Sequence, residues 1–182
     1  MEKTIKLYIA NLGKYIEGEL VGEWFDLPCD MNEVANVIGL NNQYEEYAIH
    51  DYEAPFKIGE YDSIDKLNEI QESININVDA ELFPFIETIA EQWFNGDILE
   101  MCESMDDITV YIDCMTIEDV AYVIVENSGM LDSCSDEIKR YFDYSAFGRD
   151  IEIEGNFLYL PFEYSGGQWG KSYGGFYVEY IW

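Results

Sequence analysis

The sequence has few positive charges. Lysine and arginine together supply 9 of the 182 residues, and there is a single histidine, His50. Proteins that bind nucleic acid or anionic membranes need clustered lysine and arginine to contact phosphate groups. The sequence therefore excludes ordinary, direct nucleic-acid binding and argues against an anionic membrane surface as partner.

Long apolar runs are also missing. There is no run of about 18 apolar residues, which a membrane-spanning helix would need. Residues 1–6 (MEKTIK) lead directly into an alternating pattern instead of a charged and then apolar signal segment. We therefore expect a soluble protein of the cytoplasm without a membrane partner.

Cysteine is scarce and irregularly spaced. The four cysteines form no C-x-x-C pair, and His50 is far from all of them in sequence: Cys29, Cys102, Cys114 and Cys134. Zinc sites and disulfide scaffolds usually have recognisable spacings. We expect reduced, partly buried thiols, with no metal ion and no other cofactor.

Acidic and aromatic residues are abundant. The chain carries 38 aspartates and glutamates, a formal net charge of −29, 48% hydrophobic residues and 16% aromatic residues. Charged disordered chains are poor in aromatic and β-branched residues, so this chain is predicted to fold. The acids are spread evenly: residues 1–60 hold 12 acids and 4 bases, residues 61–103 hold 11 and 1, and residues 104–182 hold 15 and 4. A halophile's solvated surface, or a device that keeps the protein soluble, is one interpretation of such a charge.

The first 60 residues predict a small sheet covered by a helix. Period-two alternation indicates strands over residues 4–12 and 19–27, joined by a connection over 13–18, and a third strand over about 46–53. Asp30 is a predicted N-cap, with Glu33 at the capping-box position, for a short helix that Gly39 ends. Residues 45–53 would alternate strictly between two faces.

From Ser63 the period changes to that of a helix. Ile64, Leu67, Ile70 and Ile74 share one face. A second helix is predicted after Asp79, with Pro84 in its first turns and Asn95-Gly96 at its end, and a third over residues 97–104.

The last part mixes strands and helices. The pattern predicts a strand over 107–113, a helix over 117–127 with a Thr116–Asp119 capping box and a Gly129 stop, a helix from Ser135 to Phe147 that Gly148 stops, and strands over 150–154, 157–162 and 176–182. The predicted fold class is α+β in three small domains. These are residues 1–60 (antiparallel sheet with helix), 61–103 (helical) and 104–182 (α+β with an antiparallel sheet).

Three patterns could carry catalysis. His50 and Asp51 could form an acid–base pair, but neighbouring strand residues point to opposite faces and no nucleophile motif accompanies them. Carboxylate pairs suited to glycoside hydrolysis have almost no specificity among so many acids. Residues 166–172 (GGQWGKS) resemble a phosphate-binding loop, yet the required first glycine falls on Ser165 and the following residues do not predict a helix. We expect no enzyme.

The charge itself favours imitation of DNA. B-DNA carries one charge per about 1.7 Å of axis, so 29 charges correspond to about 49 Å of duplex, or about 15 base pairs. A compact globule of this length would be only about 41 Å across. The hypothesis therefore requires an elongated chain of three negative units, and a dimer would double its length. Residues 40–56, where acids alternate with tyrosines, show in one segment the acid-rich and aromatic-rich composition of the whole chain.

Four long strings resemble the ArdA antirestriction family. They are residues 8–15 (YIANLGKY), 18–25 (GELVGEWF), 44–53 (YEEYAIHDYE) and 141–150 (YFDYSAFGRD). The likeness extends to about Phe157, and the middle helical part is similar in character only.

The resemblance implies an elongated three-domain α+β protein, encoded on a mobile genetic element, that forms a homodimer through its C-terminal domain in a bacterial cytoplasm. It implies mimicry of bent duplex DNA in the groove of type I restriction-modification enzymes, both the methyltransferase core and the full nuclease, without catalysis. The family's antirestriction segment would fall near residues 119–131, which are less acidic here.

The same acidic surface could instead occupy a CRISPR effector or a nucleoid or transcription protein. The acids expected to take the place of phosphates are Glu45, Glu46, Asp51, Glu53, Asp62, Asp65, Glu69, Glu72, Glu87, Glu91, Asp106, Asp107, Asp119 and Glu126. The expected dimer contact is Ala121, Tyr122, Ile124 and Val125.

Overall fold

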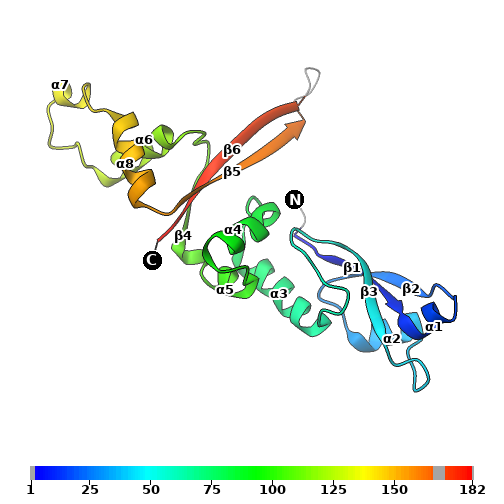
Figure 1. Ribbon diagram of the computed structural model, residues 1–182. Coiled ribbons are helices and arrows are strands. Elements are labelled where there is room, and N and C mark those ends of the chain that lie inside the picture. The colour runs from blue at the N-terminus through cyan, green and yellow to red at the C-terminus, as the bar shows by residue number, and fades with distance from the viewer. Residues whose placement is uncertain (1–2, 166–170, 182) are drawn as a thin grey trace. The chain divides into compact units, whose positions relative to one another are not determined.

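The computed structural model describes residues 3–165 and 171–181 (Figure 1). Within these residues the chain is α+β, with eight α-helices and two antiparallel three-stranded sheets, which confirms the predicted fold class. It divides into two compact units, Met1–Met105 and Asp106–Trp182, described here one at a time. The division into three domains and the elongated arrangement stay predictions.

The sheet of the first unit has the strand order β2-β1-β3. Its strands are β1 (Lys6–Asn11), β2 (Gly22–Asp26) and β3 (Tyr47–Glu53), close to the predicted ranges. Between β1 and β2 the chain forms one helical turn, α1 (Leu12–Ile16), which Asn11 caps by accepting from the Lys14 N–H at 3.0 Å. From the sequence, residues 13–18 were predicted only to connect the two strands.

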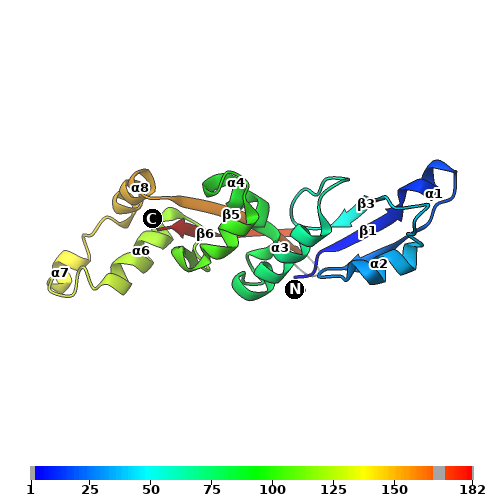
Figure 2. The same ribbon diagram turned by 90° about the horizontal axis from the view of Figure 1, so that it is seen from below.

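Helix α2 (Met31–Ile38) packs beside β1 and β2 on one face of this sheet (Figure 2). Asp30 is its N-cap and Gly39, at φ 71°, ends it in the left-handed conformation, both as predicted. The Asp30 carboxylate accepts from the Asn32 N–H at 2.8 Å. Asp30 and Gly39 therefore fix both ends of the helix locally.

Strand β3 is irregular at His50. Ile9 lies opposite Ile49, whereas Tyr8 lies opposite Asp51, so His50 is inserted without a β1 partner of its own. Such a bulge interrupts the alternation of side chains, and Ala48 and Ile49 are both buried. The prediction of strictly alternating faces over residues 45–53 is therefore wrong at this position.

Four helical segments complete the first unit: α3 (Ile64–Asn77), the 3-10 turn η1 (Phe83–Phe85), α4 (Ile86–Trp93) and α5 (Ile98–Glu103). The predicted apolar stripe of α3 is confirmed, because Ile64, Leu67, Ile70 and Ile74 are buried. Pro84 lies in the 3-10 turn that leads into α4, where a missing N–H costs little.

Side-chain amides of α3 join these helices to the sheet. The Gln71 amide, 1% exposed, accepts from the Ile5 N–H at 2.7 Å and donates to the Lys3 carbonyl at 2.7 Å. Asn68 makes the same two-point contact with the backbone of Cys29, at 2.9 Å in each direction. These hydrogen bonds therefore join helix α3 to the backbone of Lys3, Ile5 and Cys29.

The second unit has the sheet order β4-β6-β5. The strands are β4 (Ile108–Tyr111), β5 (Phe157–Ser165) and β6 (Lys171–Tyr180), and the helical segments are η2 (Met105–Asp107), α6 (Ile117–Ser128), α7 (Asp136–Lys139) and α8 (Tyr144–Glu154). The Thr116–Asp119 capping box and the left-handed Gly129 at the end of α6 are confirmed.

Two predictions about residues 135–154 are wrong. Helix α7 ends at Lys139, a new helix begins after Asp143, and residues 150–154 continue that helix instead of forming a strand. Asp143 caps α8 by accepting from the Ala146 N–H at 2.9 Å. Gly148 does not stop a helix: it lies inside α8, where an added Cβ would come within 3.0 Å of the Ile117 carbonyl oxygen of α6. The packing of α8 on α6 therefore determines the secondary structure of this region.

Candidate acidic binding surface

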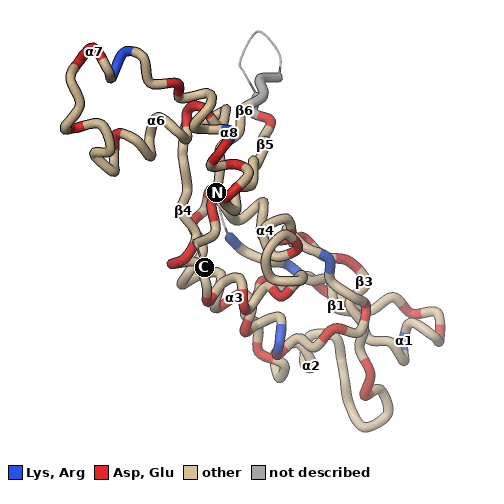
Figure 3. The backbone as a smooth tube through the Cα atoms, turned by 60° about the vertical axis from the view of Figure 1, so that its left-hand side comes forward, with Lys and Arg blue, Asp and Glu red and all other residues tan. Residues whose placement is uncertain are grey.

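The carboxylates lie on the surface of both units. Over residues 3–165 and 171–181, every aspartate and glutamate is exposed except Glu87 and Glu179, which are partly buried. Figure 3 shows acidic residues recurring along each unit, with few basic ones among them. A surface of this kind is suited to a partner of opposite charge.

Few of these carboxylates are neutralised within the chain. In the part of the chain that the structure describes, ion pairs join Lys6 to Asp26 at 3.7 Å, Lys14 to Glu19 at 3.8 Å and Lys57 to Glu87 at 3.9 Å. Exposed pairs of this length contribute at most about 1 kcal/mol each. Most of the predicted contact acids are therefore available to cations from another molecule.

The predicted acids of the first sheet lie before β3 and in its second half. Glu45 and Glu46 precede β3, and Asp51 and Glu53 follow the bulge, all exposed. The Asp51 carboxylate accepts from the N–H of the next residue at 2.9 Å, which fixes its direction. The bulge thus brings Asp51 opposite Tyr8 on the sheet.

Helix α3 presents the most regular acidic row. Asp65, Glu69 and Glu72 are exposed on the side away from its buried isoleucines. Because a helix rises 1.5 Å per residue, these three positions span about 10 Å. Asp62, just before the helix, accepts from the Gly59 N–H at 2.7 Å. The sequence predicted this face, and the structure places its members together.

Other predicted acids differ in their surroundings. Glu87 of α4 is partly buried and binds both the backbone N–H, at 3.2 Å, and the ammonium of Lys57. It therefore offers less free charge than Glu91, which is exposed on the same helix. In the second unit Asp106 and Asp107 are exposed in η2, and Glu126 is exposed on α6.

Asp119 is exposed, but it also has a structural role. One oxygen of its carboxylate accepts from the Thr116 N–H and hydroxyl, both at 2.8 Å, and from the Met115 N–H at 3.1 Å. These bonds satisfy donors at the start of α6 that the helix itself leaves unpaired. Asp119 is therefore a helix-capping residue, and its contact with a partner stays a prediction.

Replacing Asp119 by alanine is expected to lower the free energy of unfolding by about 1 to 2 kcal/mol, because the capping box is lost. Urea denaturation measures this change. The control is Glu118→Ala, which removes a charge from the same first turn of α6 but no capping bond, and should cost less than about 0.5 kcal/mol. Equal losses in the two variants would contradict the capping role.

The residues expected at a dimer contact separate into two groups. Ala121 and Val125 are buried in the second unit's own core, at 0% and 1% exposure, so they have no surface to offer a second chain. Tyr122 is 53% exposed, and Ile124 is partly exposed. Only Tyr122 and Ile124 of this set stay as predicted contacts.

Carboxylates also act on neighbouring tyrosines. A hydrogen bond from the Tyr44 hydroxyl to Glu17, 2.8 Å long, raises the pKa of that phenol. The charge of Glu60 raises the pKa of Tyr61. Burial, and then a bond to Glu179 at 2.7 Å, raises the pKa of Tyr111. These phenols stay neutral hydrogen-bond donors beside the acids.

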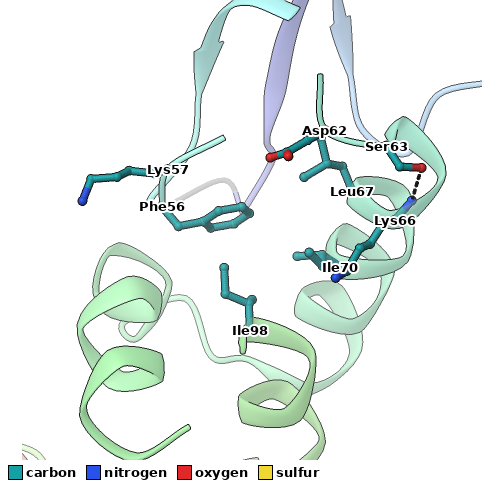
Figure 4. A pocket seen from close by; sticks show the side chains of 8 residues that line it. All are labelled: Phe56, Lys57, Asp62, Ser63, Lys66, Leu67, Ile70 and Ile98. Atoms are coloured by element: carbon teal, nitrogen blue, oxygen red, sulfur yellow. Dashed lines mark hydrogen bonds between the residues drawn. The ribbon is translucent and has the colours of Figure 1, made fainter. Parts of the chain in front are cut away.

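The first unit also has a hollow of about 160 Å³ (Figure 4). Phe56, Leu67, Ile70 and Ile98 form its apolar part, with Lys57, Asp62, Ser63 and Lys66 at the rim. The Ser63 hydroxyl accepts from the Lys66 N–H as the cap of α3. Asp62 and Ser63 therefore both hold local backbone in place here.

The patterns considered for catalysis gain no support from the geometry. His50 packs edge-on against Tyr15, with ring centroids 4.8 Å apart. Residues 166–170 of the loop-like string lie outside the described residues. Lys171 begins strand β6, whereas a phosphate-binding loop would lead into a helix.

A comparison with protein families decides the identity of the chain. The model of the antirestriction protein (ArdA) family matches residues 7–165. The chain belongs to this family. Membership in the ArdA family implies antirestriction, the inhibition of type I restriction enzymes, by an inhibitor that is not a known catalyst.

The family match confirms the resemblance seen in the sequence. It includes the predicted acids from Glu45 to Glu126, and it ends at Ser165, before strand β6. No curated protein matches the chain. None of the helices in the described residues is long and apolar enough to cross a membrane.

Proposed function

We propose that the chain imitates duplex DNA and occupies the DNA-binding groove of type I restriction-modification enzymes, so that it inhibits them without catalysis. The observation that carries this proposal is the surface of exposed carboxylates, few of which are paired within the described residues. Family membership supplies the target class.

The mechanism is competition for the enzyme's lysines and arginines. A groove built to neutralise phosphates carries clustered positive charge, and the inhibitor brings a net charge of −29 to it. Each exposed ion pair contributes little, so the affinity comes from many pairs acting together. Salt screens such pairs, and binding should therefore weaken steeply as ionic strength rises.

The proposal also covers the oligomeric state of the protein and the cell in which it acts. A homodimer through the second unit, with Tyr122 and Ile124 of α6 at the contact, would double the length of charged surface offered to the enzyme. Both residues present surface beyond the unit's own core. The protein would act in the cytoplasm of a bacterial host, where it protects an incoming mobile genetic element.

The test is displacement of DNA from a purified type I methyltransferase. Labelled duplex bound to the enzyme is titrated with the chain at low and moderate salt, and fluorescence anisotropy reports the bound fraction. We expect stoichiometric release at low salt and a clear loss of potency at moderate salt. If the active enzyme keeps its DNA at low salt, the type I assignment fails. Parallel titrations of a CRISPR effector and a nucleoid protein then identify a different DNA-binding target.

A further inference from the structure

The two faces of the first sheet differ in burial. Leu7 and Ile9 of β1 are fully buried, and Asn11, two residues further on, donates to a carbonyl oxygen of α2 at 3.1 Å. This face of the sheet therefore lies against α2. Because the side chains of a strand alternate between its faces, Lys6 and Tyr8 point to the opposite side, where both are partly exposed.

The strand register places two rows of side chains on this opposite side. The first row, from β2 through β1 to β3, is Trp24, Tyr8 and Asp51, and the second is Asp26, Lys6 and Glu53. Neighbours in a row are about 4.8 Å apart along the backbone, and the rows are about 7 Å apart. We call these six residues the open face of the first sheet. It combines two aromatic side chains with three carboxylates and one ammonium group.

Trp24 is held in place by the sheet and keeps an exposed ring. Its indole meets the Tyr8 ring edge to face, with ring centroids 5.6 Å apart, and its backbone N–H donates to the Glu23 carboxylate at 3.0 Å. The Tyr8 ring lies over Gly22, where an added Cβ would come within 2.9 Å of it. Trp24 is nevertheless 40% exposed, whereas Phe25, on the α2 side of the same strand, is 9% exposed. The indole is thus a supported apolar surface that another molecule can reach.

The charges of the open face are unevenly neutralised. Lys6 pairs with Asp26 at 3.7 Å, on the β2 side. On the β3 side Asp51 and Glu53 are exposed, and no residue that the structure describes forms an ion pair with either of them. The hydrogen bond from the Tyr52 N–H uses one oxygen of Asp51. The β3 side of the open face therefore offers two carboxylates to cations from outside.

This chemistry suits a partner surface that presents arginine and lysine. Guanidinium groups stack on aromatic rings, most strongly on tryptophan, and bind carboxylates, while their aliphatic stems cover apolar surface. The first unit contains a related contact of its own, since the Lys14 ammonium lies 5.9 Å from the Tyr44 ring centroid. A groove that binds DNA carries such cations in clusters.

We propose that the open face docks on the positively charged wall of the inhibited enzyme's DNA-binding groove, with Trp24 as its anchor. The proposal rests on the proposed function and deepens it, because it adds an aromatic contact to the ion pairs. A few tryptophans, tyrosines and arginines supply most of the binding energy at protein interfaces. Exposed carboxylates give many weak pairs that salt screens. The Trp24 contact adds affinity that depends less on salt.

The first experiment measures displacement of labelled duplex from the type I methyltransferase by full-length variants at low and moderate salt. Trp24→Thr removes the indole and keeps a residue suited to a strand. It is expected to raise the concentration for half-release about 10- to 30-fold. The factor should be the same at both salts, because the indole carries no net charge. Trp24→Phe, which keeps a smaller ring, should fall between wild type and Trp24→Thr.

The carboxylates of the open face are tested separately. Asp51→Asn combined with Glu53→Gln is expected to raise the concentration for half-release about 5-fold at low salt and to make its salt dependence shallower.

Two matched controls remove similar groups elsewhere. Glu33→Gln combined with Glu100→Gln removes the same charge from exposed helix positions of the first unit. Tyr141→Thr removes a ring that is 84% exposed in the second unit. Both controls should stay within about 2-fold of wild type. Circular dichroism verifies that each variant is folded.

A second measurement detects the Trp24 side chain directly in the wild-type chain. Hydroxyl radicals oxidise exposed aromatic side chains, and mass spectrometry gives the rate of oxidation at each one. On addition of the methyltransferase we expect the rate at Trp24 to fall about 5-fold or more, because an anchor residue is fully desolvated in its interface. The rate at Tyr141 should stay unchanged.

The outcomes separate the two proposals. If wild type releases DNA but Trp24→Thr matches it at both salts, the open face is refuted and the proposed function stands. If Trp24→Thr is less potent but Trp24 is oxidised equally fast with and without the enzyme, the indole only supports the sheet, and the docking proposal is again refuted.

If wild type releases no DNA from the active enzyme, the proposed function fails, and a short polyarginine peptide then tests the open face by itself. Slower oxidation of Trp24 in the presence of the peptide would keep the preference of this face for a cationic partner. Unchanged oxidation would overturn the open face as well.

Discussion

Converting the four acids at helix α3 to amides is expected to raise the concentration of inhibitor needed for half-release of DNA by roughly 30-fold, as four exposed pairs of about 0.5 kcal/mol each are lost. The variant carries Asp62→Asn, Asp65→Asn, Glu69→Gln and Glu72→Gln. The four residues are exposed; Asp65, Glu69 and Glu72 follow one side of the helix, and Asp62 lies just before it. The dependence of release on salt should also become shallower, because fewer charges take part.

The same variant separates binding from folding. Like charges four residues apart, such as Asp65 and Glu69, or three apart, such as Glu69 and Glu72, repel each other along the helix. At position 62 the amide oxygen of asparagine can still accept from the Gly59 N–H, so removing these charges should leave stability unchanged or raise it by up to about 1 kcal/mol. Weaker inhibition by a more stable protein could not be attributed to unfolding.

A dispersed set of four amides in the first unit is the control. Glu33, Glu81, Glu100 and Glu103 are exposed and were not predicted as contacts. Their conversion to glutamine changes the net charge by the same amount. If both sets weaken inhibition equally, only total charge matters. If the α3 set has no effect, this face takes no part in binding.

Replacing Gln71 by leucine is expected to lower the free energy of unfolding by about 3 kcal/mol. The Gln71 amide is the hydrogen-bond partner of the Ile5 N–H and the Lys3 carbonyl, in a place where the side chain is 1% exposed. Leucine has a similar volume but no polar atoms, so it would leave two backbone groups unpaired away from water. A buried group without a partner costs about 1 to 3 kcal/mol.

Urea denaturation with an unchanged dependence on denaturant measures this loss. Gln92→Leu on α4 is the matched control, because Gln92 is exposed, and it should change stability by less than about 0.5 kcal/mol. A loss below about 1 kcal/mol for Gln71→Leu would show that the amide does not hold the start of β1 to α3. At temperatures where Gln71→Leu stays folded, inhibition should equal that of wild type.

The position of Gln71 was readable in part from the sequence. It falls beside Leu67, Ile70 and Ile74 on the apolar side of the predicted helix, and a lone amide in such a stripe indicates a buried polar group with a partner. The identity of that partner was not readable. Lys3 and Ile5 are distant in sequence, and only the packing of α3 on the first residues of the chain brings them to Gln71.

The error over residues 150–154 has a related cause. Alternating isoleucines and acids in this segment fit a strand, but Ile153 is 82% exposed in the helix that actually forms. The cap at Asp143 starts the helix, and Gly148 allows α8 to approach α6. Local alternation could not reveal a contact with a helix more than twenty residues earlier in the chain.

The sequence by itself determined the charge, the α+β class, the caps of α2 and α6, the acidic row of α3 and the family. These features depend on composition or on residues within one or two helical turns, whose interactions are the same in any fold. The tertiary structure decided the bulge at His50, the secondary structure of residues 135–154 and the hydrogen bonds of Gln71 to Lys3 and Ile5. Each depends on which distant segment packs against which, because long-range contacts select among conformations that local preferences leave close in free energy.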